Sequence, residues 1–291
     1  MLGAEPEVAD VVVVGGGIAG CAAALAATRK GAEVVLLTKL HDPEEANTRY
    51  AQGGIVYTGP DDSSGLLVRD VLEAGAGESS RAAAELLSRE GSPLVRGLLI
   101  EDLGVPFDRD ANGFEGLHLT LEGAHSVPRI LHVGGTTGYE IQYALTSAVR
   151  TEPRITLLPA TEVLDLVVSR GQCVGISAAK DGEVLTVLGR GVLLATGGMG
   201  ALYEHTTNPP AATGDGYALA LRAGALVRDL HYIQFHPTAL CGSDGERFLI
   251  SEAVRGEGGV LKDPDGEELL DHPLGSLAPR DVVARGIQSM M

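Results

Sequence analysis

The chain has 291 residues, of which 44% are apolar and 40 are glycine, and its formal net charge is −17 at pH 7. This length allows one large or two ordinary domains with a real core, and the composition suits a loop-rich α/β enzyme. The negative charge argues against nucleic acid and against an anionic membrane surface as partners, because binding a polyanion requires clustered Lys and Arg.

The cysteines and the N-terminal segment predict a cytoplasmic protein. Cys21, Cys173 and Cys241 are far apart in the sequence and form no C-x-x-C pair, so we expect reduced thiols without a chemical role. Acidic residues, and no basic region, precede the first apolar segment, so no secretory signal is visible. The uncharged stretch 11–28 approaches the length of a membrane span, but its four glycines favour a strand and a helix instead.

Residues 11–38 predict a strand, a tight turn, a helix and a second strand. Four consecutive valines, residues 11–14, are too few for a helix, and the alanine-rich segment after the turn ends at Gly31. In this βαβ crossover Gly15, Gly17 and Gly20 occupy the three glycine positions of a dinucleotide fingerprint, which allow the turn, a close approach to a pyrophosphate and tight helix packing. An unrelated glycine-rich loop is the alternative. The residues that we expect to contact a dinucleotide here are Gly15, Gly16, Gly17, Ile18, Ala19 and Gly20.

The end of the second strand departs from the NAD-binding pattern. The acidic residue that usually binds a ribose hydroxyl is replaced by Thr38 and Lys39. A cation there suits a phosphate or a differently held adenosine ribose. The polar, glycine-ended segment that follows stands where a loop would cover the nucleotide crevice. The predicted cofactor site therefore also includes Lys39, Asn47, Thr48, Arg49, Tyr50, Ala51, Gln52, Gly53 and Gly54.

The middle of the chain combines scaffold with one unusual polar segment. Residues 66–103 read as helical, with Ser92-Pro93 as a suitable cap and first-turn pair. Three histidines, Glu122 and Arg129 then fall within residues 118–132 of a chain that has eight His in all. No spacing among them fits a zinc motif, and the intervening glycine indicates a loop, so no metal is expected. The alternative is an ordinary solvated polar loop.

The pattern of the next hundred residues completes the predicted fold. Short strands are expected at 155–158, 162–169, 172–179 and 184–189, and a separate buried strand at 191–194 leads into a glycine turn. Asp215 reads as the N-cap of a helix over 216–223. The predicted fold class is α/β: a Rossmann-like domain with a parallel sheet and an inserted β-meander, followed by the start of an α+β domain.

Three late stretches are candidates for chemistry. Residues 234–238, 251–259 and 278–281 are short, polar and bounded by glycine or proline, which suits loops that face a cleft. Taken singly, each could be surface, since a His before Pro is usually a satisfied turn residue and charged pairs are usually solvated.

Together, the motifs resemble one flavoprotein family. The A-Q-G-G run after the G-G-G-I-A-G turn, with F-H-P-T, S-E-A-V-R-G-E-G-G and P-R-D later, is similar to the flavoprotein subunits of succinate dehydrogenases, fumarate reductases and L-aspartate oxidases. The stretch H-L-T-L-E-G-A-H-S most strongly resembles the L-aspartate oxidases. The resemblance covers nearly all of residues 10–286. It implies an FAD-dependent oxidoreductase that converts L-aspartate to iminoaspartate in NAD biosynthesis and passes electrons to oxygen or fumarate.

The resemblance also implies how the cofactor and the substrate are held. Asn47 stands where membrane-bound members carry a histidine that bonds to the flavin, so FAD should be bound noncovalently. Glu122 would accept the substrate amino group, His236 would hold a carboxylate, and Ser251 would supply a hydroxyl in place of the commoner Thr. Leu121 and Val133-Gly134-Gly135 depart from the Arg and the A-A-D that members often carry. Further residues implied in cofactor binding are Glu162, Val163, Thr196, Gly197 and Asp215.

The catalytic residues implied by the resemblance are two arginines and a glutamate. Arg280 would be the proton donor or acceptor, assisted by a relay through Glu252 and Arg255. Because a free guanidinium keeps its proton far above neutral pH, this role requires Glu252 to lie between the two arginines, where the proton can leave as it arrives.

Two other functions stay open, as does the extent of the domains. A soluble fumarate reductase or succinate dehydrogenase flavoprotein is opposed by Glu122 and Asn47. A non-catalytic FAD-binding or assembly module is the second, because members of the family continue well beyond this length. We expect residues 1–233 to form an FAD-binding domain that lacks its C-terminal segment, and residues 234–291 to begin a truncated capping domain. Whether a quinolinate synthase partner is engaged is also open.

Overall fold

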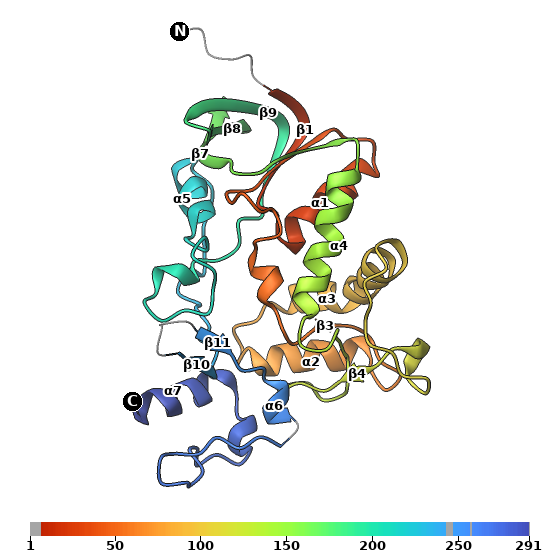
Figure 1. The fold of residues 1–291 in the computed structure, drawn as a ribbon, viewed down its shortest axis with the longest axis vertical. Helices are drawn as coiled ribbons and strands as arrows, with labels where there is room; N and C mark the ends of the chain where they lie inside the picture. The colour runs from red at the N-terminus through yellow and green to blue at the C-terminus, as the bar shows by residue number, and fades with distance from the viewer. Residues whose placement is uncertain (1–6, 243–246, 257, 291) are drawn as a thin grey trace. The chain divides into compact units, whose positions relative to one another are not determined.

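The computed structural model describes residues 7–242, 247–256 and 258–290, which fall into two compact units (Figure 1). Unit 1 comprises Met1–Tyr50 and Gly138–Tyr232, and unit 2 comprises Ala51–Thr137 and Ile233–Met291. Unit 1 therefore contains the βαβ crossover and the β-meander. Unit 2 contains the polar segment 118–132 and all three late polar stretches.

Unit 1 is built on a six-stranded sheet with the order β6-β2-β1-β9-β8-β7. The first four strands are parallel, and β9-β8-β7 form an antiparallel meander at one edge. This arrangement confirms the predicted α/β fold class with a parallel sheet and a meander. The strands are β1 Glu7–Val14, β2 Val34–Leu37, β6 Ile155–Leu158, β7 Glu162–Ser169, β8 Gln172–Lys180 and β9 Glu183–Leu194.

The prediction of two strands between residues 184 and 194 was wrong, because β9 is continuous. Its first half pairs with β8, from Glu183 to Leu188, and its second half extends the pairing with β1 as far as Leu194. Gly189, which was expected to end the first of these strands, lies in the middle of β9, where a Cβ atom would come within 2.8 Å of the Val12 side chain. The glycine thus permits close contact between strands.

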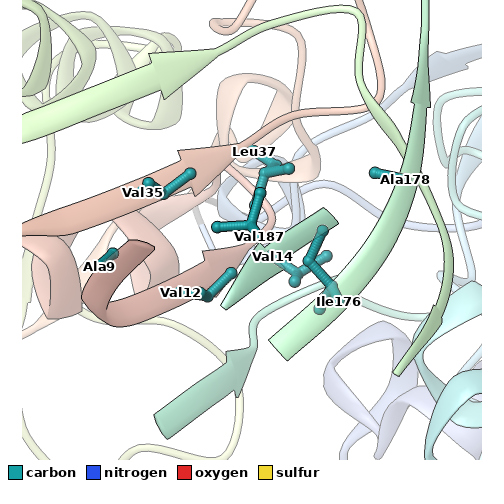
Figure 2. Packing of buried hydrophobic residues seen from close by; sticks show 8 residues of the cluster. All are labelled: Ala9, Val12, Val14, Val35, Leu37, Ile176, Ala178 and Val187. Atoms are coloured by element: carbon teal, nitrogen blue, oxygen red, sulfur yellow. The ribbon is translucent and has the colours of Figure 1, made fainter. Parts of the chain in front are cut away.

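The core of unit 1 lies on the sheet (Figure 2). Val12 and Val14 of β1 lie among residues of β2, β8 and β9, and all eight side chains drawn are nearly excluded from solvent. Because residues of parallel strands are buried on both faces, the four-valine run needs no polar alternation. The cluster consists of Ala9, Val12, Val14, Val35, Leu37, Ile176, Ala178 and Val187.

Helices flank this sheet. In α4, Ile141, Leu145 and Val149 are buried, which is the spacing of one helical face. The same helix contacts the glycine turn before α1, where Gln142 Nε2 donates a hydrogen bond to the Gly16 carbonyl at 2.8 Å. The helices of unit 1 are α1 Ile18–Thr28, α5 Asp215–Arg222, the 3₁₀ turns η1 Asn47–Tyr50 and η4 Gly200–Leu202, and α4 Thr137–Thr151, which begins at the last residue of unit 2.

Unit 2 combines helices with two small antiparallel sheets. The first sheet has the order β3-β5-β4 and the second is the hairpin β10-β11. The strands are β3 Ile55–Val56, β4 Leu119–Thr120, β5 Ile130–Leu131, β10 Ala239–Cys241 and β11 Arg247–Leu249. The helices are α2 Ser64–Ala74, α3 Arg81–Leu94, the π-helix η2 Val95–Asp102, η3 Phe114–Gly116, α6 Ala253–Gly256, η5 Gly275–Leu277 and α7 Arg280–Met290.

The predicted helix start at Ser92-Pro93 was also wrong. Both residues lie inside α3. The predicted helical run is instead interrupted between Ala74 and Arg81, and Ser63 and Ser80 cap the starts of α2 and α3 through their side-chain oxygens. Pro93 has no N–H to donate, and the helix continues after it with the wider turns of η2. Across the residues that the structure describes, none of these helices has the length and apolar character needed to cross a bilayer.

Candidate functional site

The glycine turn of unit 1 has the conformation that its sequence predicts. Gly15 has a φ of +112°, and a Cβ atom there would overlap the Ala195 carbonyl oxygen. A Cβ atom at Gly20 would overlap the Gly15 carbonyl oxygen, so the first turn of α1 closes directly on the end of β1. Gly17 differs, since a Cβ atom there would meet only Thr48 Oγ1 at 3.3 Å and the Ala46 methyl at 3.9 Å. The second glycine therefore leaves the outer side of the turn open, as a pyrophosphate requires.

A cavity of about 640 Å³ lies beside this turn within unit 1. The strand ends Val14, Leu37 and Leu194 contribute to its wall, so it opens at the carboxyl edge of the parallel strands. That edge is where doubly wound sheets bind nucleotides. The predicted cofactor residues that line the cavity are Gly15, Gly16, Gly17, Ile18, Ala19, Lys39, Asn47, Thr48, Glu162, Val163, Thr196, Gly197 and Asp215.

The other predicted cofactor residues do not line this cavity. Gly20 packs against the Gly15 carbonyl inside the turn. Arg49 forms ion pairs with the carboxylates of Asp42 and Glu44 at 3.5 and 3.9 Å. The Tyr50 hydroxyl donates to Glu45. The run Ala51, Gln52, Gly53 and Gly54 belongs to unit 2. There, Gln52 Oε1 is buried and accepts no hydrogen bond from any residue that the structure describes.

The Lys39 ammonium group has one carboxylate and one hydroxyl partner. It donates to Asp215 Oδ2 and to Thr213 Oγ1, both at 2.8 Å. Burial alone would raise the pKa of Asp215, but the hydrogen bonds from Lys39 and Thr213 outweigh it and lower the pKa. Asp215 is the first residue of α5 and makes no capping bond, so its predicted role as N-cap was wrong. Gly214, in the left-handed region at φ +77°, occupies that position.

Sequence reasoning missed two other features of this turn. The backbone N–H of Ile18, the first residue of α1, donates a hydrogen bond to Thr48 Oγ1 at 3.0 Å. Behind the turn, Cys21 Sγ and Gln142 Nε2 both donate to the Gly16 carbonyl, and burial raises the pKa of the Cys21 thiol to about 12. The signal for Thr48 was its place in the polar loop after the second strand. Gln142 carried none, since it lies 126 residues from Gly16.

In unit 2, Glu252 lies between two arginines. Its Oε1 accepts from Arg255 Nη2 at 2.8 Å, and its Oε2 accepts from Arg280 Nε at 2.8 Å and Nη2 at 2.6 Å. Arg255 is 4% exposed and also donates to the Ser276 carbonyl, whereas the Arg280 side chain is 37% exposed. The Arg280 guanidinium is therefore the one that solvent or a ligand can reach.

Glu122 is half-buried beside this group. Burial raises the pKa of the Glu122 carboxyl, the negative charge of Glu252 raises it further, and Arg280 opposes both. The carboxylate lies against Gly53, where a Cβ atom would overlap Glu122 Oε1. A Cβ atom at Gly123 would lie 3.1 Å from Glu252 Oε1. Both glycines therefore allow the polar groups to approach each other closely.

The remaining predicted substrate residues flank the cluster. His236 is half-buried, and its pKa is lowered first by burial and then by the positive charge of Arg280. Its Nδ1 lies 3.3 Å from Thr238 N, which donates to it. Ser251 directly precedes Glu252 and is partly exposed. Gln234, which begins the candidate stretch 234–238 but was given no role of its own, accepts from Arg280 Nη1 at 2.9 Å. Its signal was its position two residues before His236.

Comparison with known proteins agrees with this geometry. A family model described as "FAD binding domain" matches residues 10–290. The L-aspartate oxidase of Halobacterium salinarum is 44% identical over 96% of this chain and 55% of its own length. That of Streptomyces coelicolor is 46% identical over 97% of this chain and 50% of its own length. A solved quinol fumarate reductase of E. coli is 28% identical, with a TM-score of 0.89 over 98% of this chain and 51% of that one.

The chain spans about half the length of the curated relatives that it matches. The family model, by contrast, covers nearly all of it, including the glycine turn, the cavity beside it and the Glu252 cluster. The left-handed Gly15, the open side of Gly17 and the cavity at the strand ends are the features that such a cofactor needs. The chain therefore belongs to the FAD binding domain family.

Proposed function

We propose that this chain carries the FAD site and the substrate site of an enzyme that oxidises L-aspartate to iminoaspartate. The observation that carries the proposal is the half-buried Glu122 carboxylate beside the Glu252–Arg280 pair. A carboxylate facing an ammonium group separates an amino-dicarboxylate from succinate, which lacks that group. The relatives named L-aspartate oxidase, at 44% and 46% identity, support the same substrate.

We assign the nucleotide part of FAD to the cavity of unit 1. The open side of Gly17 and the N-terminus of α1 would face the pyrophosphate, and the ion pair of Lys39 with Asp215 would line the same cavity. Asn47 lines the same cavity, and an amide forms no bond to a flavin carbon, so the cofactor would be noncovalent. Acid precipitation of the purified protein should then release all the FAD into the supernatant.

Gly20→Ala tests the assignment of the glycine turn. The added methyl overlaps the Gly15 carbonyl oxygen, so the turn must open and α1 must move away from β1. We expect the variant to purify without bound FAD and to lose about 1–3 kcal/mol of unfolding free energy. Gly91→Ala is the control, because position 91 lies inside α3 with only an ordinary contact at 3.5 Å. Equal visible absorption in wild type and Gly20→Ala would contradict the assignment.

The cluster of unit 2 has the charges that an amino-dicarboxylate requires. Arg280 would bind one substrate carboxylate, His236 the other, and Glu122 the ammonium group. Ser251 would add a hydroxyl donor. Arg280 would therefore offer positive charge to one substrate carboxylate and Glu122 negative charge to the ammonium group, whereas His236 and Ser251 would offer neutral hydrogen-bonding groups to the other carboxylate.

Glu252 would allow Arg280 to transfer a proton without losing its charge. Arg280 donates two hydrogen bonds to one oxygen of Glu252, and Arg255 donates to the other. When a substrate proton reaches Arg280, a proton can pass from Arg280 to Glu252, and the guanidinium stays positive. FAD, when bound, supplies the acceptor for the two electrons of the oxidation.

Glu122→Gln should lower kcat/KM for L-aspartate about 10–100-fold and change fumarate reduction little. The amide cannot pair with the substrate ammonium, and a hydrogen bond to a charged group contributes about 1.5–3 kcal/mol. The wild type should also show an acid limb in kcat/KM. Since the pKa of Glu122 is raised, its carboxylate takes up a proton at a higher pH than an ordinary Glu, and ammonium binding weakens as the pH falls through that pKa.

Comparing the pH profiles completes this test. Glu122→Gln should lack the acid limb, because it has no proton to gain at this position. A variant with unchanged aspartate kinetics, or with the same acid limb as the wild type, would contradict the role of Glu122.

The second candidate function is a fumarate reductase or succinate dehydrogenase flavoprotein. The similarity to the quinol fumarate reductase, with a TM-score of 0.89, favours it. Turnover of L-aspartate and of succinate by the wild type separates the two. Faster succinate oxidation would replace the aspartate proposal. A yellow protein that oxidises neither substrate would instead indicate a non-catalytic FAD-binding module.

A further inference from the structure

Unit 2 contains a fully buried ionic network next to the proposed substrate site. Arg129 is completely excluded from solvent, and the side chains of Asp62 and Asp70 are 2% and 6% exposed. Arg129 Nη2 donates to Asp62 Oδ1 at 2.9 Å, and its Nη1 donates to Asp70 Oδ2 at 2.8 Å. Removing these charges from water is costly, and the two carboxylates offset that cost for Nη1 and Nη2, whereas Arg129 Nε is buried without a hydrogen-bond partner among the described residues.

This network fixes the loop that bears Glu122. Asp70 Oδ2 also accepts from the backbone N–H of Ser126 at 2.9 Å and from its hydroxyl at 2.8 Å. Within the loop, the His125 N–H donates to the Glu122 carbonyl at 3.2 Å. One carboxylate of α2 therefore sets the position of residues 122–126, and with them the proposed ligand of the substrate ammonium.

The network also determines which nitrogen of His125 carries a proton. Arg129 Nη1 lies 3.3 Å from His125 Nδ1, and a guanidinium can only donate, so Nδ1 must be the acceptor. The pKa of His125 is lowered by burial and then by the charge of Arg129, which keeps the ring neutral. A neutral ring with Nδ1 as acceptor carries its single proton on Nε2.

His125 lies in the same neighbourhood as the catalytic cluster. The loop that carries His125 passes Glu252 two residues earlier, where a Cβ atom on Gly123 would be 3.1 Å from Glu252 Oε1. A neutral N–H donor is well suited to this place. It can bind a carboxylate oxygen without adding a third positive charge that would repel the substrate ammonium.

We propose that His125 is a further substrate-binding residue, which donates from Nε2–H to a carboxylate oxygen of the dicarboxylate, with Arg129 and Asp70 as its positioning residues. This inference rests on the proposed function, since it assumes a dicarboxylate in unit 2. The buried network then has a specific role, because it orients one imidazole nitrogen toward Arg129 and leaves the other for the ligand.

Two substitutions distinguish binding from a merely structural role. In His125→Asn the side-chain oxygen can replace Nδ1 as the acceptor for Arg129, but nothing replaces Nε2–H. In His125→Gln the amide nitrogen reaches the place of Nε2. Binding of succinate to the FAD-loaded protein would be measured by calorimetry, with His118→Asn, an exposed histidine four residues before Glu122, as the control.

We expect His125→Asn to weaken succinate binding about 10–100-fold, and His125→Gln to recover most of that loss. All three variants should keep the unfolding midpoint of the wild type. Loss of binding in His125→Gln with full binding in His125→Asn would overturn the proposal, as would equal dissociation constants throughout. If the wild type binds succinate but does not oxidise L-aspartate, the proposed reaction is wrong, and the binding measurements still decide whether His125 contacts the dicarboxylate.

Discussion

Arg280→Lys should lower kcat for L-aspartate about 10²–10⁴-fold, the usual contribution of a positioned acid or base. Arg280 makes three hydrogen bonds from one planar group, two to Glu252 and one to Gln234. A lysine ammonium keeps the charge but cannot make this fork, so the proton path through Glu252 is lost. KM should rise less than kcat falls, because the positive charge still attracts a substrate carboxylate.

The matched control is Arg285→Lys on the same helix, α7. Arg285 is 73% exposed and pairs only with Asp281 among the contacts in the described part of the chain. Both variants should retain FAD, measured by visible absorption, and differ only in steady-state turnover. A kcat for Arg280→Lys within about threefold of the wild type would remove Arg280 from the proton path.

Arg129→Met should cost about 3–5 kcal/mol of unfolding free energy, the usual effect of removing one member of a buried ion pair. Asp62 and Asp70 would then face each other without a cation in a region closed to solvent. At neutral pH one of them must take up a proton or the segment must open. Urea denaturation, monitored by circular dichroism, gives the loss directly.

The control for this stability change is Arg81→Met. Arg81 is 68% exposed and its only described ion pair, with Glu85 at 3.8 Å, lies on the surface of α3. Its loss should stay below about 1 kcal/mol. Adding Asp62→Asn to Arg129→Met should recover part of the stability, because it removes one of the two opposed charges. If Arg129→Met and Arg81→Met were equally stable, the buried network would have no energetic role.

The features that sequence predicted well depend on short-range patterns. The strand, the glycine turn and α1 follow from residues within one segment, and the cavity residues Lys39 and Asn47 follow from their distance to that turn. The positions of β7 and β8 in the meander were also predicted, because glycine turns separate its strands. The error at β9 arose because Gly189 packs against a neighbouring strand, which local sequence does not reveal.

The features that sequence could not predict join distant residues. Arg129 belongs to the segment for which a solvated polar loop was the alternative interpretation, yet it is buried against Asp62 and Asp70, which lie 67 and 59 residues earlier in the sequence. Asp215 lies at the start of a helix, as predicted, but its side chain accepts a hydrogen bond from Lys39, which is 176 residues away in the sequence. Nothing in the spacing of either segment encodes such pairs. Only the fold brings them together.

The pairing of β1 with β9 has a consequence during protein synthesis. Val12 pairs with Val192, 180 residues later, while the intervening Ala51–Thr137 belongs to the other unit. At ordinary ribosomal speeds of about 5–20 residues per second, the nascent β1 waits on the order of 10–40 s for this partner. During that interval its valine-rich edge is open to other chains. We therefore expect this protein to depend on chaperones when it is expressed rapidly.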